Sequence, residues 1–346
     1  MKFLLAPISW IYGLVVWIRN HLYDNHILHS SQVSIPTICV GNLAVGGTGK
    51  TPMTEYLLNL LSSQYKVAVL SRGYGRDTKG FRLANEHDSA QTIGDEPMQI
   101  HSRFPDIPVA VCADRVKGIK RLQQLFPKLQ CVILDDAFQH RKLRCGFYVL
   151  LTPYERLYVH DHMLPWGRLR DIPSQSIRAN VVVTTKCPHN MPPIQRRIVS
   201  NALQLPSFQQ LFFSSIDYQP LNLPGTPLLV TGVANPQPLL KHLSEQYPNI
   251  ELLAFPDHHV FTEKDVKLIL TKAKKYKCVV TTEKDYMRLR QTPLVLQLAN
   301  KLYIQSIKME FANDKDAFDR AILLYVSENV RKLVSSDTHD NAQSKI

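Results

Sequence analysis

The sequence contains no C-x-x-C pair, no low-complexity tract and no clear tandem repeat. Its six cysteines are scattered along the chain, and four of them fall inside β-like apolar runs, at positions 39, 112, 131 and 278. This distribution argues against a disulfide framework and against a zinc site of the usual spacing. We therefore expect the thiols to be small, buried side chains in a reduced compartment.

Acidic residues are scarce compared with basic ones, 29 against 41, and the formal net charge is +12. Such a charge favours an anionic partner, which could be nucleic acid, a nucleotide, a phosphorylated substrate or an acidic membrane surface. A solvated basic surface would give the same totals. Because the sequence has no helix-turn-helix and no interleaved aromatic–basic stripe, we expect no nucleic-acid partner, and no obligate protein partner is evident.

An apolar run long enough to cross a bilayer, about 20 residues, is also missing. The uncharged stretch "FLLAPISWIYGLVVWI" covers residues 3–18 but is interrupted by proline and glycine, and it lacks the features of a signal peptide. Trp10, Leu14 and Trp17 are spaced as one face of a helix. We predict that residues 1–30 form a membrane-associated helix region lying in the interface, where tryptophan is favoured. A helix buried in the core and a true span are the alternatives.

Short β-branched runs alternate with helix-like segments along most of the chain. Strands are predicted at 37–41, 67–71, 108–112, 131–135, 147–151 and 180–185. This alternation predicts an α/β fold with a doubly wound and mostly parallel sheet over residues 31–220. The loop motif and the resemblance given below make this region a P-loop NTPase-like kinase domain. The chain length of 346 residues also favours more than one domain.

A proline-rich stretch, "YQPLNLPGTP" at 218–227, reads as a linker, and the alternation starts again after it. Strands are predicted at 228–232, 251–255 and 278–282, with a helix near 236–246. We therefore predict a smaller α/β domain over residues 221–330, closed by a C-terminal helix from about residue 313. Residues 331–346 are expected to form a polar tail.

The stretch "VGNLAVGGTGKTPMTEYLL" resembles a phosphate-binding loop with one departure. The pattern G-x-x-x-x-G-K-[ST] matches at Gly49, Lys50 and Thr51, but Ala44 occupies the position of the first glycine. A preceding strand and a following helical pattern give the expected context, and Ala44 is tolerable if its position needs no positive φ. Lys50 would reach the phosphates and Thr51 would supply a hydroxyl to Mg²⁺. A plain glycine turn is the alternative. The candidate nucleotide-binding residues are Gly46, Gly47, Thr48, Gly49, Lys50 and Thr51.

The run "CVILDDAFQH" ends a predicted buried strand in Asp135 and Asp136. A strand-terminal aspartate holds Mg²⁺, directly or through water, in P-loop enzymes. A turn or a helix cap is the usual role of such a pair taken alone. Together with the upstream loop, the pair predicts a metal site.

Two further motifs offer acid–base chemistry. Asp95 and Glu96 in "IGDEPMQI" either cap a helix or supply the base for an attacking hydroxyl. His258 and His259 in "FPDHHVFT" either form a polar turn or provide a histidine oriented by a carboxylate. Adjacent histidines rarely bind one metal, so no zinc site is expected. The runs "LSRGYGR" (70–76) and "ADRVKG" (113–118) follow predicted strands and either bind an anion or form basic turns.

Seven motifs occur in one order: "GGTGKTP", "SRGYGR", "GDEP", "DDAFQH", "LPWGRLRD", "FPDHHVF" and "TTEKD". Together with the apolar N-terminus they resemble the tetraacyldisaccharide 4′-kinases of lipid A biosynthesis, over roughly residues 1–310. The resemblance implies ATP- and Mg²⁺-dependent phosphorylation of the 4′-hydroxyl of a tetraacylated glucosamine disaccharide 1-phosphate. It also implies a location at the cytoplasmic face of the bacterial inner membrane, against an anionic membrane surface.

The same resemblance assigns roles to individual residues. It implies that Lys50 takes part in catalysis, that Asp95 is the catalytic carboxylate and that His258 is its partner from the other domain. Thr51, Asp135 and Asp136 would lie on the metal side. Asp171 of "LPWGRLRD" stands where the family often has glutamate, and is a further metal candidate. A regulatory or nucleic-acid-binding P-loop NTPase and a soluble metabolic kinase are the competing hypotheses.

Overall fold

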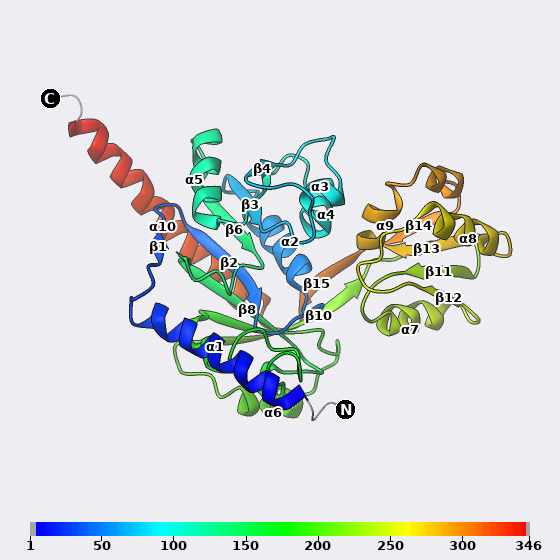
Figure 1. The fold of residues 1–346 in the computed structure, drawn as a ribbon, viewed down its shortest axis with the longest axis horizontal. Coiled ribbons are helices and arrows are strands. Elements are labelled where there is room, and N and C mark those ends of the chain that lie inside the picture. The colour runs from blue at the N-terminus through cyan, green and yellow to red at the C-terminus, as the bar shows by residue number, and fades with distance from the viewer. Residues whose placement is uncertain (1–4, 344–346) are drawn as a thin grey trace.

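The computed structural model describes the backbone of residues 5–343 and the side chains of residues 5–333 and 335. Residues 3 and 4 of the predicted apolar stretch and residues 344–346 of the predicted tail lie outside this range. Two mostly parallel sheets lie side by side, each with helices on both faces (Figure 1). The predicted α/β fold, with a larger and a smaller sheet, is therefore confirmed.

The larger sheet has nine strands in the order β15-β10-β9-β8-β2-β6-β3-β5-β4. All neighbours are parallel except β10–β15 and β4–β5, which are antiparallel. The strands are β2 (Thr37–Asn42), β3 (Val67–Ser71), β4 (Arg82–Leu83), β5 (Val109–Val111), β6 (Cys131–Asp135), β8 (Phe147–Pro153), β9 (Val181–Thr185), β10 (Gln210–Tyr218) and β15 (Ile307–Phe311). Two short strands, β1 (Ser31–Gln32) and β7 (Leu143–Arg144), pair separately.

The central strands are apolar because both faces of the sheet are covered. Alternate residues of β2 point to opposite cores: Cys39 packs in one, while Ile38 and Val40 pack in the other. Helices α5 (Arg115–Leu125) and α6 (Pro193–Leu203) cover the first face. Helices α2 (Lys50–Leu61), α4 (Asp95–Arg103) and α10 (Lys315–Gln343) cover the second, and the short α3 (Ala90–Ile93) precedes α4.

The smaller sheet is parallel throughout, in the order β12-β11-β13-β14. Its elements are β11 (Pro227–Thr231), α7 (Gln237–Gln246), β12 (Glu251–Ala254), α8 (Glu263–Ala273), β13 (Cys278–Thr282), α9 (Glu283–Leu289) and β14 (Leu302–Gln305). Helix α8 packs on one face and α7 on the other. Three-residue to six-residue 3₁₀ helices occur at Tyr158–His160, Pro173–Arg178 and Pro293–Leu298.

The C-terminal segment differs from the prediction, which placed it in the smaller domain. Strand β15 pairs with β10 of the larger sheet, and Phe318, Ile322 and Val326 of α10 join the core of that sheet. The helix also continues through the predicted polar tail as far as Gln343. The apolar spacing on α10 fits a helix in either domain, so only strand pairing determines where it packs. Two strands, β10 and β15, thus connect the two sheets.

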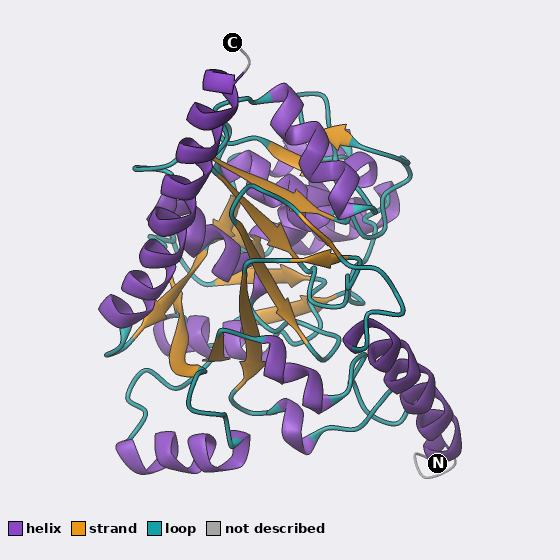
Figure 2. Cartoon of the chain, turned by 90° about the vertical axis from the view of Figure 1, so that its left-hand side faces the viewer, coloured by secondary structure: helices purple, strands orange, loops and turns teal. Residues whose placement is uncertain are grey.

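The predicted N-terminal helix is α1 (Ala6–Asp24), which lies on the surface (Figure 1). In Figure 2, α1 and α10 flank the larger sheet on opposite sides. Trp10 exposes 71% and Trp17 51% of their surface, and Ile11, Leu14 and Val15 are exposed beside them. None of the helices within residues 5–343 combines the length and the apolarity needed to span a membrane.

Candidate active site

The phosphate loop connects β2 to α2 at the carboxyl edge of the larger sheet. Gly46 has φ 106° and Gly49 has φ 91°, conformations that a side chain disfavours, whereas Ala44 does not have a positive φ. Ala44 instead forms a bridge with Leu169, which shows why the first glycine of the pattern is dispensable here. Pro52 lies in the first turn of α2, where its missing N–H is not needed.

Side chains at the ends of β2 and β9, which lie on either side of β8, hold the loop in place. The amide of Asn42 donates to Oγ1 of Thr48 at 2.7 Å, and the hydroxyl of Thr185 donates to the carbonyl of Thr48 at 2.8 Å. The second bond joins the end of β9 to the loop. Because the loop backbone is fixed from both sides, its N–H groups are arranged before any phosphate binds.

Asp136 lies directly beside the loop lysine. Its Oδ2 is 3.9 Å from Nζ of Lys50, and both of its oxygens accept hydrogen bonds from Arg170. Arg170 also donates to Oδ1 of Asn42 at 2.5 Å. Burial raises the pKa of Asp136, but Lys50 and Arg170 outweigh it and lower the pKa below its usual value. The carboxylate is therefore ionised in the middle of a cluster of cations.

Asp135 has the opposite environment. It is buried, and its neighbours are the hydroxyls of Thr54 at 3.5 Å and Ser71 at 3.4 Å. Burial, followed by the charge of Asp136, raises its pKa to about 7. A buried carboxylate with only two long hydroxyl contacts suits a cation partner.

The donor set fits Mg²⁺. Within the described residues, no group of three or more His, Cys, Asp or Glu side chains is placed to hold a metal. Mg²⁺ needs no such cage, since it is commonly bound by one or two carboxylates, water and the phosphates of a nucleotide. Asp135 ends β6, Asp136 follows it and Thr51 is the second residue of α2, so their oxygens are the donors that these elements would offer to the ion.

Two cations that the sequence reasoning missed flank the loop. A Cβ atom at Gly46 would lie 3.7 Å from NH1 of Arg168, and one at Gly47 would lie 3.7 Å from Nζ of Lys186, so both cations are close to the loop. Neither basic residue belongs to the P-loop pattern, because both come from later segments of the chain. Lys186 directly follows β9, so a basic residue after a predicted parallel strand was the available signal.

The two domains meet at Asp95, the first residue of α4. Its Oδ2 accepts hydrogen bonds from Nε of Arg288 at 3.0 Å and from NH2 of Arg288 at 2.5 Å. Nδ1 of His258 lies 3.1 Å from the same oxygen. His258 follows β12 and Arg288 lies on α9, so both partners come from the smaller domain. The predicted pair is thus brought together, and Arg288 is an addition that the "TTEKD" motif did not reveal.

The charge state of Asp95 follows from these contacts. Burial alone would raise its pKa, but the hydrogen bonds from His258 and Arg288 hold the pKa well below its usual value. Asp95 therefore stays ionised throughout the neutral pH range. The neighbouring Glu96 pairs with Lys284 of α9 at 2.7 Å, which adds a second ionic contact across the same junction.

The structure also separates the two histidines. Nε2 of His259 lies 3.0 Å from Oδ2 of Asp265, and its ring stacks on Phe255, so His259 belongs to the start of α8. His258 alone faces the larger domain. The geometry therefore supports the choice of His258 over His259.

Asp171 does not join the metal-side group. It is fully buried, its Oδ1 accepts from Nδ2 of Asn20 on α1 at 2.7 Å, and its Oδ2 lies 3.6 Å from Arg178. These contacts connect α1 to the larger domain. The predicted metal role of Asp171 is thus not supported, because its carboxylate is enclosed by protein side chains.

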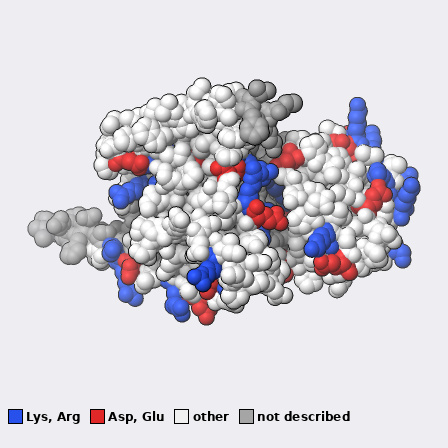
Figure 3. Space-filling model, turned by 90° about the horizontal axis from the view of Figure 1, so that it is seen from below, with Lys and Arg blue, Asp and Glu red and all other residues white. Residues whose placement is uncertain are grey.

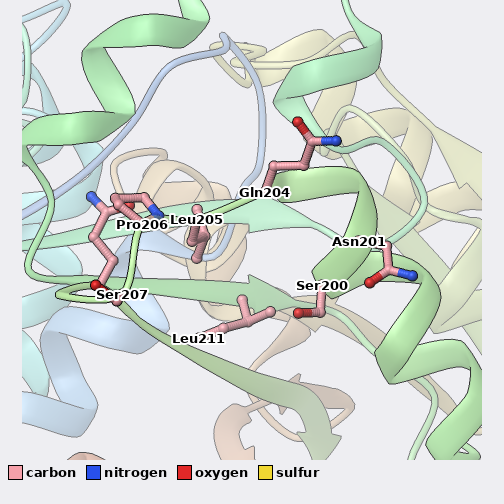
Figure 4. A pocket seen from close by; sticks show the side chains of 8 residues that line it. Ser200, Asn201, Gln204, Leu205, Pro206, Ser207 and Leu211 are labelled. Atoms are coloured by element: carbon pink, nitrogen blue, oxygen red, sulfur yellow. The ribbon is translucent and has the colours of Figure 1, made fainter.

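One cavity of about 420 Å³ lies away from this site, between the end of α6 and the start of β10. Figure 4 shows Ser200, Asn201 and Gln204 on the helical side and Leu211 on the strand. Since β10 runs parallel to β9 and the cavity adjoins the start of β10, it lies at the amino edge of the sheet. Ligands of such sheets bind at the carboxyl edge, where the phosphate loop is.

Comparison with known proteins decides the family. The sequence matches the family model described as "Tetraacyldisaccharide-1-P 4'-kinase" over residues 1–327. The chain belongs to this kinase family. The prediction of an ATP-dependent kinase is thereby confirmed, and the regulatory NTPase alternative is disfavoured.

Individual tetraacyldisaccharide 4′-kinases match over nearly their whole length. The relative from Flavobacterium johnsoniae is 45% identical, with 95% of this chain and 98% of the relative covered. That from Bacteroides thetaiotaomicron is 42% identical, with 98% and 97% covered. A solved structure of LpxK from Aquifex aeolicus, in complex with ATP, is 26% identical, covers 94% of this chain and 99% of its own, and has a TM-score of 0.74.

Proposed function

We propose that this protein transfers the γ-phosphoryl group of Mg²⁺-ATP to the 4′-hydroxyl of a tetraacylated glucosamine disaccharide 1-phosphate. The Asp95–His258–Arg288 contact across the two domains is the observation that carries this proposal, because it fixes an ionised carboxylate at the domain junction of a protein that also has a phosphate loop. The family's name and the ATP complex of the Aquifex relative support the donor and acceptor.

The phosphate loop binds the donor. Its backbone N–H groups and Lys50 would contact the phosphates, while Thr51, Asp135 and Asp136 would hold Mg²⁺. When bound, the ion neutralises charge that develops on the transferred group. Arg168 and Lys186 add positive charge on the other side of the loop. Arg170 keeps Asp136 ionised and fixed beside Lys50.

Asp95 orients the acceptor. A carboxylate with a lowered pKa is a weak base, yet a weak base suffices for phosphoryl transfer, since the loose transition state needs the hydroxyl positioned more than deprotonated. We propose that Asp95 accepts a hydrogen bond from the 4′-hydroxyl and takes its proton late in the transfer. His258 and Arg288 hold the carboxylate in place from the other domain, so the site is complete only when the domains are in contact.

The proposed location is the cytoplasmic face of the inner membrane, with α1 lying in the interface. The exposed tryptophans of α1 are of the kind that favours such a position. Seen from below, the part of the molecule that includes α1 shows few charged side chains (Figure 3). A net charge of +12 suits an anionic leaflet.

The direct test is turnover of ATP with tetraacyldisaccharide 1-phosphate in mixed micelles, followed by ³¹P NMR of the lipid product. The proposal expects a second phosphomonoester at the 4′ position, and its loss in Lys50→Ala. Phosphorylation at another position, or ATP hydrolysis without lipid phosphorylation, would contradict it. Lys128→Ala, which changes an exposed lysine before β6, is the matched control.

A further inference from the structure

Arg103, the last residue of α4, forms a link between three parts of the molecule. Its NH1 lies 2.7 Å from Oε2 of Glu55 on α2 and 3.5 Å from Oε2 of Glu283, the first residue of α9. The same nitrogen donates to the carbonyl of Ile307, the first residue of β15, at 3.4 Å. Arg103 is not among the ATP-binding or proton-accepting residues, so the proposed chemistry does not account for these contacts.

Gln99, one turn earlier on α4, bridges the same two carboxylates. Its Nε2 donates to Oε1 of Glu55 at 3.0 Å and to Oε2 of Glu283 at 3.5 Å. Asp95, Gln99 and Arg103 are spaced four residues apart and therefore lie along one face of the helix. This face meets the smaller domain, and Figure 1 shows α4 on the side of the larger domain that faces α9.

Two carboxylates share the guanidinium of Arg103. Glu55 is nearly enclosed, with 4% of its side chain exposed, whereas Glu283 exposes 17%. Burial raises the pKa of Glu55 to about 7, Arg103 lowers it and the charge of Glu283 raises it. The arginine is thus the charge that allows the two acidic side chains, one from each domain, to stay close. Without it, the carboxylates would repel each other across the domain junction.

Glu283 is also fixed at one of the two connections between the sheets. Its Oε1 accepts from the hydroxyl of Ser306 at 2.9 Å, and Ser306 lies between β14 of the smaller sheet and β15 of the larger one. Arg103 contacts the same connection through the carbonyl of Ile307. The link therefore holds the smaller domain at a place where the chain crosses from one sheet to the other.

The position of the link on α4 determines what it can do. Arg103 lies about 12 Å along the helix from Asp95, at about 1.5 Å of rise per residue. At the Asp95 end, the smaller domain is attached through Arg288 and His258. One attachment would let α4 pivot against α9, whereas two attachments this far apart fix the angle between them. Glu55 extends the link to α2, the helix that follows the phosphate loop.

We propose that Arg103 is a positioning residue for phosphoryl transfer: by bridging Glu55 and Glu283, it fixes the smaller domain against α4 and so fixes Asp95 relative to the phosphate loop. It acts through these carboxylates and not by contact with a substrate. This inference rests on the proposed function, because it concerns the placement of the residue that orients the acceptor. Contact between the domains can nevertheless be measured without any substrate, which separates the two proposals.

Three variants test the link. Arg103→Gln removes the cation but keeps an amide donor, Glu283→Gln removes the carboxylate of the smaller domain, and the double variant removes both. Because Glu283→Gln leaves the buried Glu55 paired with Arg103, it remains a test even if Arg103→Gln unfolds the protein. Lys308→Ala is the matched control, since it removes an exposed basic side chain of β15 next to Ile307. Circular dichroism and thermal unfolding establish which variants are folded.

The first measurement is steady-state kinetics with Mg²⁺-ATP and tetraacyldisaccharide 1-phosphate. Each single variant should lower kcat about tenfold, the order expected for losing a hydrogen bond to a charged group, with KM for ATP nearly unchanged. The double variant should also lose about tenfold, because both substitutions break one link. A loss of about a hundredfold in the double variant would show that the two residues act independently and would overturn the proposal.

The second measurement is the distance between spin labels on the two domains, without substrate. The six native cysteines are buried, so labels attach selectively to Lys128→Cys in the larger domain and Lys264→Cys in the smaller one, both at exposed positions. Arg103→Gln and Glu283→Gln should broaden the distribution of distances, while Lys308→Ala should match the wild type.

The proposal requires both effects and is overturned if the variants match Lys308→Ala in either measurement. A broader distribution with normal kcat would mean that the link does not position Asp95. A lower kcat with an unchanged distribution would mean that Arg103 does not act by holding the domains. If the wild type does not phosphorylate the lipid, the proposed function fails, and the distance measurement alone decides whether Arg103 holds the domains together.

Discussion

Arg288 on α9 donates two hydrogen bonds, of 3.0 and 2.5 Å, to a single oxygen of Asp95 at the start of α4. This fork joins the smaller domain to the residue that we propose orients the acceptor hydroxyl. Nδ1 of His258 lies 3.1 Å from that oxygen and 3.1 Å from NH2 of Arg288, so the three side chains form one group. Separating the two domains would break this group, so contact between the domains and an intact active site depend on each other.

Arg288→Ala should lower kcat by roughly 10- to 100-fold, less than the roughly 100- to 10,000-fold that a positioned proton acceptor contributes, because Asp95 itself remains. Asp95 would lose its fixed orientation, while ATP binding at the phosphate loop should be little changed. Steady-state kinetics with both substrates varied would measure this. Lys284→Ala is the matched control, since it breaks the Glu96–Lys284 contact across the same junction and removes one nearby charge but no hydrogen bond of Asp95. Equal losses in the two variants would mean that general domain contact, and not Asp95, is responsible.

Lys186→Ala should raise KM for ATP about fivefold, corresponding to about 1 kcal/mol, with kcat nearly unchanged. The reason is that Nζ lies beside the loop glycines and would neutralise donor phosphates in the ground state and the transition state alike. Lys186→Arg should restore most of the affinity. A normal KM for ATP in the alanine variant would show that Lys186 does not contact the nucleotide.

Asp171→Asn should leave the Mg²⁺ dependence of activity unchanged and lower the melting temperature. The amide oxygen introduced at this position can still accept from Asn20, but the partly buried Arg178 would lose its anionic partner, at a cost of about 1–3 kcal/mol. Mg²⁺ titration of activity together with thermal unfolding separates the two effects. A large increase in the Mg²⁺ concentration needed for half-maximal activity would restore Asp171 as a metal-side residue.

Glu55 on α2 should make stability depend on pH. Burial is the main reason that its pKa is raised to about 7, and the charge of Glu283 in the smaller domain also raises it. Arg103, at 2.7 Å, and a hydrogen bond from Gln99 lower the pKa but do not outweigh burial. Between its ordinary pKa and pH 7 the folded form holds a proton that the unfolded form has lost, so stability falls as pH rises through this window. One proton corresponds to about 1.4 kcal/mol per pH unit.

Glu55→Gln keeps the hydrogen-bonding side chain but removes this titration. The urea midpoint of the variant should therefore fall less steeply between pH 5 and 7 than that of the wild type. Asp135 also titrates in this range and is present in both proteins, so the difference between the two slopes reports Glu55. Identical slopes would show that Glu55 ionises normally in the folded protein.

The double variant Trp10→Ser/Trp17→Ser should reduce flotation with anionic liposomes. Each tryptophan withdrawn from water is worth about 2 kcal/mol, so the bound fraction should fall at least tenfold under subsaturating conditions. Phe208→Ser, which removes an exposed aromatic side chain outside α1, is the control. If both variants float like the wild type, the apolar surface of α1 does not hold the protein on the membrane.

The strands and the phosphate loop were predictable because their signals are local. Buried parallel strands such as β2 and β6 are continuous apolar runs, and the glycines of the loop report backbone freedom directly. Strand β10, "QLFFSSIDY", was not predicted, because its first half pairs with β9 and its second half with β15, so no single burial pattern runs through it.

Contacts between segments far apart in the sequence could not be predicted from local sequence patterns. The sequence placed Asp95 and His258 in one site only through a family resemblance, and gave no sign of Arg288, which lies 193 residues from Asp95. Asp171 was a metal candidate only through the same resemblance, whereas its partner Asn20 lies 151 residues away on α1. The domain against which α10 packs was likewise determined by the pairing of β15 with β10.

The most direct test of the account is kcat for Asp95→Asn with Mg²⁺-ATP and tetraacyldisaccharide 1-phosphate, measured beside Lys284→Ala. The amide has the shape of the carboxylate but cannot accept the hydroxyl proton, so we predict a loss of at least 100-fold in kcat with KM for ATP nearly unchanged. Lys284→Ala should remain within a few-fold of the wild type. A folded Asp95→Asn protein with kcat within a few-fold of the wild type would contradict the account.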